Sequence, residues 1–150
     1  MAGGATFERE LRKRIENYCV ENQIPAVVKR IKQEKFQPQG YDLEVDSPVL
    51  RYLAIECKSR KFDKKPAVFV LSNLFQNGQF ERIQSLLERS GRRGFLAIEA
   101  RIARKKTVFI IKWDVIARLR ARNVKQFKLC DGDDFVPYQV LGNDVWTAFQ

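Results

Sequence analysis

The sequence predicts an α/β fold, with a mixed central β-sheet and α-helices on its faces, built as a single domain. Two segments, Phe7–Asn22 and Gly78–Ser90, carry apolar residues at helical spacing. Three others, Leu50–Lys58, Phe95–Ala100 and Thr107–Trp113, have the apolar composition or the alternation of strands. A chain of 150 residues is long enough for one domain with a hydrophobic core and too short for two domains of ordinary size.

The first half of the chain is expected to form a helix followed by short strands. Thr6 is expected to cap the helix Phe7–Asn22, and Ala26–Val28 is expected to form a short apolar strand. A turn at Asp46-Ser47-Pro48 would join two strands of a hairpin. Ala67–Leu71 fits either another strand or a buried helical turn, and its periodicity does not decide between them.

The second half is expected to contain two more helices and a tail. Gly91 would end the helix that precedes it, and Asp114 would cap a short helix at Val115–Arg122. The tail Val124–Gln150, with a turn at Asp131-Gly132, would add edge strands or form a dimer contact. Its aromatic residues would pack against the sheet or stack on bases.

Composition narrows the class of protein and the chemistry. A hydrophobic content of 45% with 31% charged residues is typical of a soluble globular chain. Since no apolar run reaches the length of a membrane span and Met1–Thr6 lacks a signal-peptide core, we expect a cytoplasmic protein without a membrane partner. Three scattered cysteines, Cys19, Cys57 and Cys130, and the absence of histidine disfavour structural zinc and His-based catalysis. Any chemistry would therefore rest on carboxylates, lysines or a bound metal.

The net charge of +10 and the pI of about 9.8 indicate a polyanionic partner such as nucleic acid, with solubility alone as the alternative. Positive charge gathers in four runs, Lys29–Lys35, Lys58–Lys65, Arg101–Lys106 and Arg118–Lys128. Three of them lie in or next to predicted loops, where they could converge on one phosphate-binding surface. Lys29–Gln39 is expected to be a loop that orders on DNA. The basic residues assigned to DNA contacts are Arg9, Lys29, Arg30, Lys32, Lys35, Arg60, Lys61, Lys64 and Lys65.

An acid and a base project from the same side of the strand Leu50–Lys58. Because side chains alternate along a strand, Glu56 and Lys58 share one face and lie about 6–7 Å apart. An ion pair at a sheet edge would explain these two residues alone. Asp42, however, lies on the strand that a hairpin would place beside them, and two converging carboxylates repel unless a cation lies between them. Oxygen ligands suit Mg²⁺, and a nearby lysine can orient a water or stabilise charge on a phosphate.

Glu8 lies on the otherwise apolar face of the first predicted helix. At about 100° per residue it falls between Ile15 and Cys19, whereas Glu10 falls outside the apolar arc. One interpretation is a first-turn acid that complements the helix dipole. The other is that Glu8 faces inward, toward the carboxylates of the metal site.

The order of these residues resembles a known superfamily. Asp42 followed downstream by Glu56-Cys57-Lys58 fits the pattern of the PD-(D/E)xK nucleases, an acid and then D/E-x-K on a strand. Three segments also resemble, in order, successive blocks of the archaeal Holliday junction resolvases, and together they cover about Thr6 to Lys112. These segments are Phe7–Leu11, Ile55–Ser59 and Arg82–Ile98.

The resemblance implies a restriction-endonuclease-like fold over residues 6–112, with residues 124–150 as an extension on or beside it. It implies a metal-dependent endonuclease in which Asp42, Glu56 and the backbone carbonyl of Cys57 hold Mg²⁺, for which Mn²⁺ can substitute. Lys58 would position the attacking water, and Glu8 would complete the acidic cluster. The resemblance further implies a homodimer that acts on branched DNA, with four-way junctions favoured.

Two points stay open at this stage. Gln79 lies where many superfamily members carry a glutamine near the scissile phosphate, so it is assigned to DNA, with a polar surface residue as the alternative. The chain also departs from the resolvases, since Tyr41 precedes Asp42 and no serine lies between Val28 and Asp42. The alternatives are therefore a repair or restriction nuclease that cuts ends or flaps, and a non-cleaving DNA-binding protein on the same fold.

Overall fold

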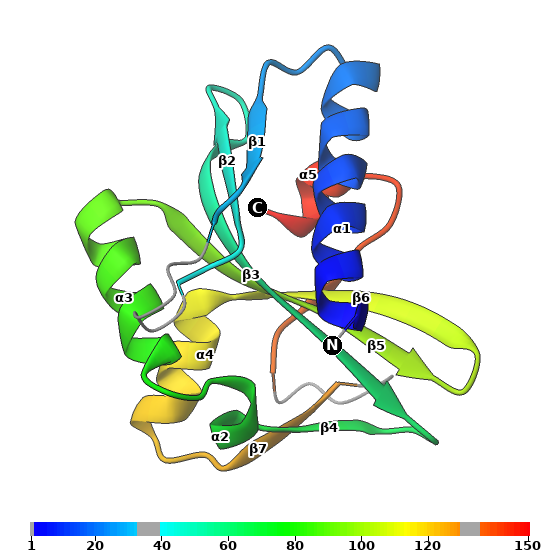
Figure 1. Cartoon of the computed structure of the whole chain (residues 1–150), viewed down its shortest axis with the longest axis vertical. Helices are drawn as coiled ribbons and strands as arrows, with labels where there is room; N and C mark the ends of the chain where they lie inside the picture. The colour runs from blue at the N-terminus through cyan, green and yellow to red at the C-terminus, as the bar shows by residue number, and fades with distance from the viewer. Residues whose placement is uncertain (1, 33–39, 130–135) are drawn as a thin grey trace.

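The computed structural model describes residues 2–32, 40–129 and 136–150, which form a twisted sheet with helices packed on both of its faces (Figure 1). The helices are α1 (Ala2–Glu21), α2 (Leu71–Leu74), α3 (Gln79–Ser90), α4 (Trp113–Ala121) and α5 (Val145–Ala148). The strands are β1 (Val27–Arg30), β2 (Leu43–Ser47), β3 (Arg51–Phe62), β4 (Ala67–Val70), β5 (Arg93–Ile102), β6 (Lys105–Lys112), β7 (Gln126–Leu129) and β8 (Gln139–Val140). None of the described helices combines the length and the apolar character needed to cross a membrane.

The main sheet has six strands in the order β1-β2-β3-β5-β6-β8, and β4 pairs with β7 in a separate two-stranded sheet. β3 and β5 run parallel, whereas every other neighbouring pair is antiparallel. Short connections join the antiparallel pairs β2–β3 and β5–β6, and the crossover between the parallel strands contains α2 and α3. This mixed sheet with flanking helices confirms the predicted fold class.

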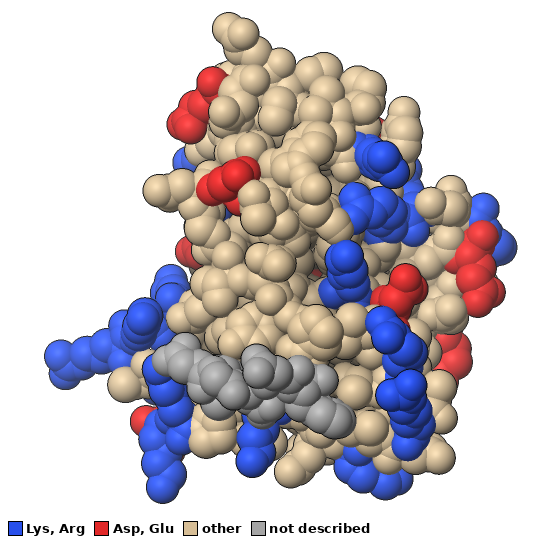
Figure 2. All heavy atoms as spheres, turned by 180° about the vertical axis from the view of Figure 1, so that it is seen from behind, with Lys and Arg blue, Asp and Glu red and all other residues tan. Residues whose placement is uncertain are grey.

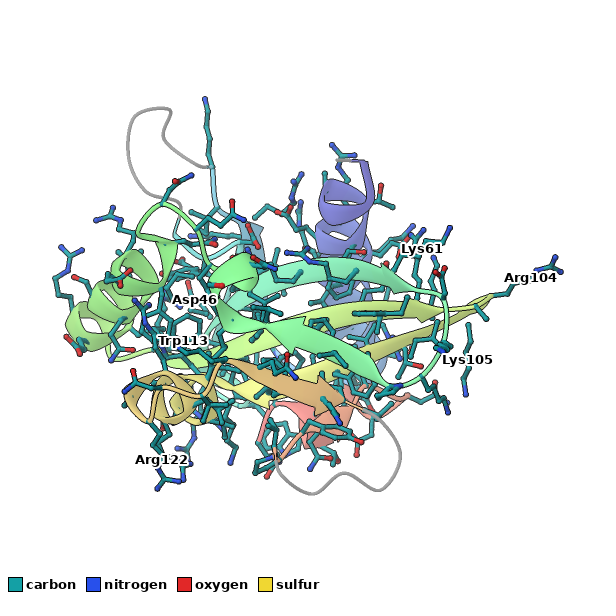
Figure 3. All side chains as sticks on the ribbon, turned by 90° about the horizontal axis from the view of Figure 1, so that it is seen from below. Asp46, Lys61, Arg104, Lys105, Trp113 and Arg122 are labelled. Atoms are coloured by element: carbon teal, nitrogen blue, oxygen red, sulfur yellow. The ribbon has the colours of Figure 1, made fainter. Side chains whose placement is uncertain are left out.

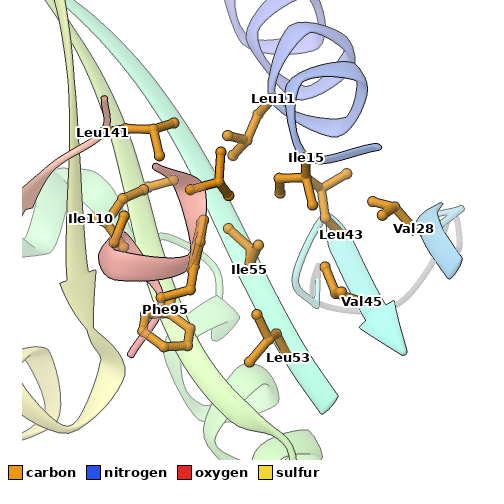
Figure 4. Packing of buried hydrophobic residues seen from close by; sticks show 14 of the residues in the cluster. Leu11, Ile15, Val28, Leu43, Val45, Leu53, Ile55, Phe95, Ile110 and Leu141 are labelled. Carbon is orange, nitrogen blue, oxygen red and sulfur yellow. The ribbon is translucent and has the colours of Figure 1, made fainter. Parts of the chain in front are cut away.

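Alternation along the central strands divides their side chains between two sides of the sheet. In β5, Phe95 packs on the side of α1 and α5, and Leu96 packs on the side of α4 and the β4–β7 sheet. Figure 4 shows Leu11 and Ile15 of α1 beside Leu43 of β2 in the first of these cores. Each fully buried aliphatic side chain of this kind contributes about 1.5–3 kcal/mol, so the cores hold α1 and the sheet in a fixed relation.

Two predicted helix starts are wrong. α1 begins at Ala2 and not at Phe7, so Thr6 lies inside the helix and does not cap it, although Gly3 and Gly4 have low helix propensity. α4 begins at Trp113 with Lys112 as its N-cap, so Asp114 lies in the first turn, where it still complements the helix dipole.

The predicted end of α3 is confirmed, and the open choice for Ala67–Leu71 is settled. Gly91 adopts a left-handed conformation with φ 73°, and its N–H donates to the Leu87 carbonyl. Ala67–Val70 is the strand β4, and α2 starts at the next residue.

The C-terminal tail packs on the sheet. β8 pairs with β6, so the tail supplies an edge strand as predicted, and Val145 and Phe149 are buried against α1 and β5. Their burial shows that packing on the sheet is their role in this chain. The predicted turn at Asp131-Gly132 lies outside the described residues.

Candidate active site

A cleft of about 520 Å³ opens beside β3, at the point where β2 separates from it. Four separate segments contribute to it: the second turn of α1, the end of β1, the residue before β2 and the middle of β3. Its lining residues are Glu8, Arg30, Ile31, Lys32, Asp42, Glu56, Cys57 and Lys58. The fold therefore brings together all four residues that the sequence predicted as catalytic, Glu8, Asp42, Glu56 and Lys58.

The register of the β2–β3 hairpin explains why Asp42 faces β3. The pairing ends with Leu43 opposite Ile55, and the Asp42 N–H donates to the Ile55 carbonyl at 3.0 Å. Beyond this pair β2 no longer covers the edge of β3, and the N–H of Cys57 at that edge donates to Asp42 Oδ2 at 2.8 Å. Because the N–H and C=O of one strand residue point to the same edge, the Cys57 carbonyl faces the cleft as well.

The Cys57 thiol lies on the other side of the strand. It belongs to the core under α1, and burial raises its pKa well above the ordinary value, so it stays a neutral thiol. As a buried, neutral thiol it is a poor ligand for a hard cation, so the backbone carbonyl is the better candidate. The family resemblance likewise implies the carbonyl, and not the sulfur, as the metal ligand.

Glu56 is buried, with 2% of its surface exposed, and its Oε2 atom is held by two side chains. Gln79 Nε2 donates to it at 2.6 Å, and Lys58 Nζ lies 3.0 Å from it. Lys58 Nζ also donates to Gln79 Oε1 at 2.9 Å, which closes a ring of three side chains. Each member of the ring fixes the other two.

Gln79 is thus not the polar surface residue that the sequence also allowed. It is the first residue of α3, it is 4% exposed, and its amide also lies 3.5 Å from the Gly40 carbonyl. The start of α3 lies against β3, which turns this side chain toward the sheet. Sequence spacing alone could not place it, because the contact depends on how the crossover returns to the sheet.

The pKa of Asp42 lies well above its usual value. Burial is the main cause, and the adjacent Glu56 carboxylate is the next. Burial, followed by the charge of Asp42, also raises the pKa of Glu8, while Arg30 lowers it. The cleft therefore holds three acids, Glu8, Asp42 and Glu56, close enough together that the pKa values of Glu8 and Asp42 are raised.

The position of Glu8 favours the inward-facing interpretation. Since α1 begins at Ala2, Glu8 lies beyond the first turn and its contact with the helix dipole is lost. Its Oε1 atom lies 3.4 Å from Arg30 Nη2 at the end of β1. Arg30, assigned to DNA from the sequence, is in the structure an ion-pair partner inside the cleft.

The residues at the cleft fit a hard divalent cation. Glu56 Oε1 is buried and has no hydrogen-bond partner among the described residues, and an orphaned carboxylate oxygen is costly unless a ligand satisfies it. No three His, Cys, Asp or Glu side chains within the described ranges form a cluster that could hold a metal ion. Two carboxylates with a backbone carbonyl suffice for Mg²⁺, which keeps several of its own waters.

The remaining predicted DNA contacts fall into three groups. Lys32 is exposed at the cleft, whereas Arg9 and Lys29 are exposed on α1 and β1 and do not line it. Lys35 lies outside the described residues, as does most of the predicted DNA-ordering loop. The other four lie at or beyond the end of β3, away from the cleft: Arg60, Lys61, Lys64 and Lys65.

Phe75 is a cleft neighbour that the sequence gave no reason to select. Its ring centroid lies 5.5 Å from Lys58 Nζ, so a cation–π contact adds to the two polar contacts of that ammonium group. Phe75 follows α2 in the crossover and has no spacing relation to the D/E-x-K pattern. Only the tertiary structure reveals it.

Comparison with known proteins identifies a similar fold. No model of a protein family matches the sequence, and no curated protein matches it. The fold is similar to that of Hjc, a Holliday junction resolvase from the archaeal hyperthermophile Archaeoglobus fulgidus, with a TM-score of 0.55 and 19% sequence identity. The match covers 85% of this chain and 88% of that one. The chain thus has the fold of a nuclease, which agrees with the predicted architecture.

Proposed function

We propose that this protein is a metal-dependent, structure-selective DNA endonuclease that hydrolyses phosphodiester bonds and resolves four-way junctions. The observation that carries the proposal is the orphaned, buried Glu56 Oε1 beside the Asp42 carboxylate, with the Lys58 ammonium group in the same cleft. The fold similarity to a Holliday junction resolvase supports the choice of substrate.

Asp42, Glu56 and the Cys57 carbonyl would hold Mg²⁺, with Mn²⁺ as a substitute. When bound, such an ion neutralises charge on a phosphate and makes its bound water more acidic. The repulsion between the Asp42 and Glu56 carboxylates would then be offset, and the partner missing from Glu56 Oε1 would be supplied. This accounts for a buried acidic pair that costs stability in the protein alone.

The side chains around these ligands would orient the water and the phosphate. Lys58, held by Glu56, Gln79 and the Phe75 ring, is placed to donate to the attacking water or to a phosphate oxygen. Gln79 hydrogen-bonds both the Lys58 ammonium group and the Glu56 carboxylate and holds them in place, which makes it a positioning residue. Arg30 and Lys32, which also line the cleft, would contact the phosphates that flank the cut.

The arrangement of the acids favours a nuclease over a DNA-binding protein on the same fold. A binding protein needs exposed cations and gains nothing from two carboxylates in the path of a phosphate. A buried Glu–Lys pair with an orphaned oxygen costs stability, and a metal-binding catalytic site would account for that cost. Resolution of a junction requires two opposed cuts, so the proposal includes a symmetric homodimer with two such clefts.

The test is cleavage of a labelled four-way junction beside linear duplex, single strand and flap, in Mg²⁺, in Mn²⁺ and in EDTA. The variant is Glu56→Gln, and the matched control is Glu88→Gln, an exposed residue of α3 outside the cleft. We expect paired nicks in the junction with wild type and the control, and none with Glu56→Gln or in EDTA. If only ends or flaps are cut, the proposed substrate changes from a four-way junction to that structure. Binding without any cutting in either metal would overturn the proposal.

A further inference from the structure

The far end of the central sheet carries a second cluster of charge, separate from the cleft. We define the basic tip as residues 60–65, at and after the end of β3, and residues 101–106, the turn between β5 and β6. Figure 3 shows Lys61, Arg104 and Lys105 at one end of the molecule and Arg122 at the other. Figure 2 shows Lys and Arg side chains projecting at this end, on the left of that view.

The basic tip holds most of the excess charge of the chain. Its twelve residues contain eight Lys and Arg and a single acid, Asp63, in a chain whose net charge is +10. Solubility requires no such concentration, since scattered charges serve it equally well. The position of the charge therefore needs its own explanation.

The strand register places residues of like charge directly opposite one another. Lys61 pairs with Arg101 across the parallel strands, and Arg101 pairs with Lys106 across the antiparallel ones. Residues that face each other on adjacent strands share a side of the sheet, so three cations form one row. Glu99 accepts from Arg101 Nε at 3.1 Å and relieves one of the three. Like charges in such a row destabilise the sheet, which indicates that a polyanion offsets the cost.

The cations of the tip are available to a ligand. Lys61, Arg104, Lys105 and Lys106 are exposed, and none of the four has an ion-pair partner among the described residues. The turn that presents them is tied to the sheet, because the Ala103 N–H donates to the Phe62 carbonyl at 3.2 Å. They therefore project from a fixed frame that is continuous with the strand of the cleft.

We propose that the basic tip binds the phosphate backbone of a duplex arm of the DNA substrate, about six base pairs from the bond that is cut. The inference rests on the proposed function and names a second, non-catalytic subsite for the same substrate. β3 rises about 3.3 Å per residue, so Phe62 lies about 20 Å beyond Glu56. Phe62 pairs with Ile102, and Ile102 pairs with Lys105, so the turn lies at the same distance. At about 3.4 Å per base step, 20 Å corresponds to about six base pairs.

The first measurement is the salt dependence of junction binding, recorded in EDTA so that cleavage plays no part. The variant is the triple change Lys61→Gln, Arg104→Gln and Lys105→Gln. The control removes the same charge from three exposed residues outside the basic tip, Lys13→Gln, Arg89→Gln and Lys112→Gln. Each lost phosphate contact lowers the slope of log K against log salt by about 0.9, so we expect a fall of about 2 to 3 for the tip variant. Equal slopes for the tip variant and the control would overturn the proposal.

The second measurement locates the contact on the DNA. Neutral methylphosphonate linkages replace the phosphates about five to eight base pairs from the branch. We expect weaker binding by wild type and by the control, and no further loss for the tip variant, since its contact is already gone. An equal loss for all three proteins would place the contact elsewhere and overturn the proposal. A wild type that binds in this way and never cuts would refute the nuclease instead, so the two failures are distinct.

Discussion

The cleft and the basic tip both include residues of β3 and differ in how the charges on this strand are placed: the ion pair in the cleft is largely buried, whereas the lysine at the tip is exposed and faces a like charge. In the cleft, Glu56 is 2% exposed and its charge is balanced by neighbours or by the ligand that we propose. At the tip, Lys61 is exposed and like charges face each other. Water screens the charges at the tip, whereas burial amplifies those in the cleft. Substitutions in the cleft should therefore change both chemistry and stability, and substitutions at the tip should mainly change binding.

The largest expected effect follows from Asp42→Asn. Cleavage should fall roughly a thousandfold because a ligand of the metal is lost, which corresponds to about 4 kcal/mol of transition-state stabilisation. Without metal, the variant should nevertheless be more stable than wild type, because the repulsion with Glu56 is removed. We expect its free energy of unfolding to rise by about 1 kcal/mol and its unfolding temperature to rise with it. Cleavage assays and thermal unfolding in EDTA measure the two effects.

Asp46→Asn is the control for this change on the same hairpin. Asp46 lies outside the cleft and accepts from Arg92 Nη1 at 2.6 Å. Its neutralisation should leave cleavage intact and lower stability, the reverse of the result for Asp42. Equal loss of stability in both variants would contradict the idea that the acids of the cleft are in conflict.

Lys58→Met should destabilise the protein more than the other substitutions in the cleft or at the tip. Removal of one partner from a buried ion pair leaves the other uncompensated, at a cost of about 3 kcal/mol. Lys61→Met, three residues along the same strand, should change stability by less than about 0.5 kcal/mol because the residue is exposed. Denaturant unfolding of both proteins measures the difference. Similar changes in the free energy of unfolding for the two variants would contradict the expected difference between cleft and tip.

Gln79→Leu should have an intermediate effect. The change preserves volume but removes the donor to Glu56 Oε2 and the acceptor for Lys58 Nζ, which costs about 1–3 kcal/mol. Cleavage should fall about 10- to 100-fold, since the side chains nearest the metal lose their orientation. The control is Gln76→Leu, an exposed residue before α3. Cleavage at the wild-type rate by Gln79→Leu would exclude the positioning role.

The smallest effect is expected at the tip. Lys106→Gln should stabilise the protein by about 0.2–1 kcal/mol, because the charge opposite Arg101 is removed. It should also lower the salt slope of DNA binding by about 1. Lys105→Gln should lower that slope without the gain in stability, since Lys105 faces Ile102. A loss of stability in Lys106→Gln would show that the row of like charges carries no cost.

The parts of the site that the sequence predicted are those that local geometry determines. Alternation with a period of two places Glu56 and Lys58 on one side of β3, and a hairpin must bring Asp42 beside them. The helical period likewise directs Glu8 inward. These inferences need no knowledge of how distant elements pack.

The parts that could not be predicted depend on tertiary packing. Gln79 and Phe75 reach Lys58 only because the crossover returns α3 and its preceding turn to the face of β3. Arg30 pairs with Glu8 because β1 ends beside α1, a relation that neither sequence segment encodes alone. The start of α1 could not be predicted from the residues before Thr6, because the helix runs through Gly3 and Gly4, which have low helix propensity.

The most direct test of the central claim is the binding of Mn²⁺ to the DNA-free protein, followed by the electron paramagnetic resonance signal of the free ion. The claim is that Asp42 and the orphaned oxygen of Glu56 form a cation site. Wild type and Asp46→Asn should reduce the free Mn²⁺ signal in proportion to protein, whereas Asp42→Asn and Glu56→Gln should leave it close to that of buffer. Equal Mn²⁺ uptake by all four proteins would place any bound ion elsewhere and contradict the account.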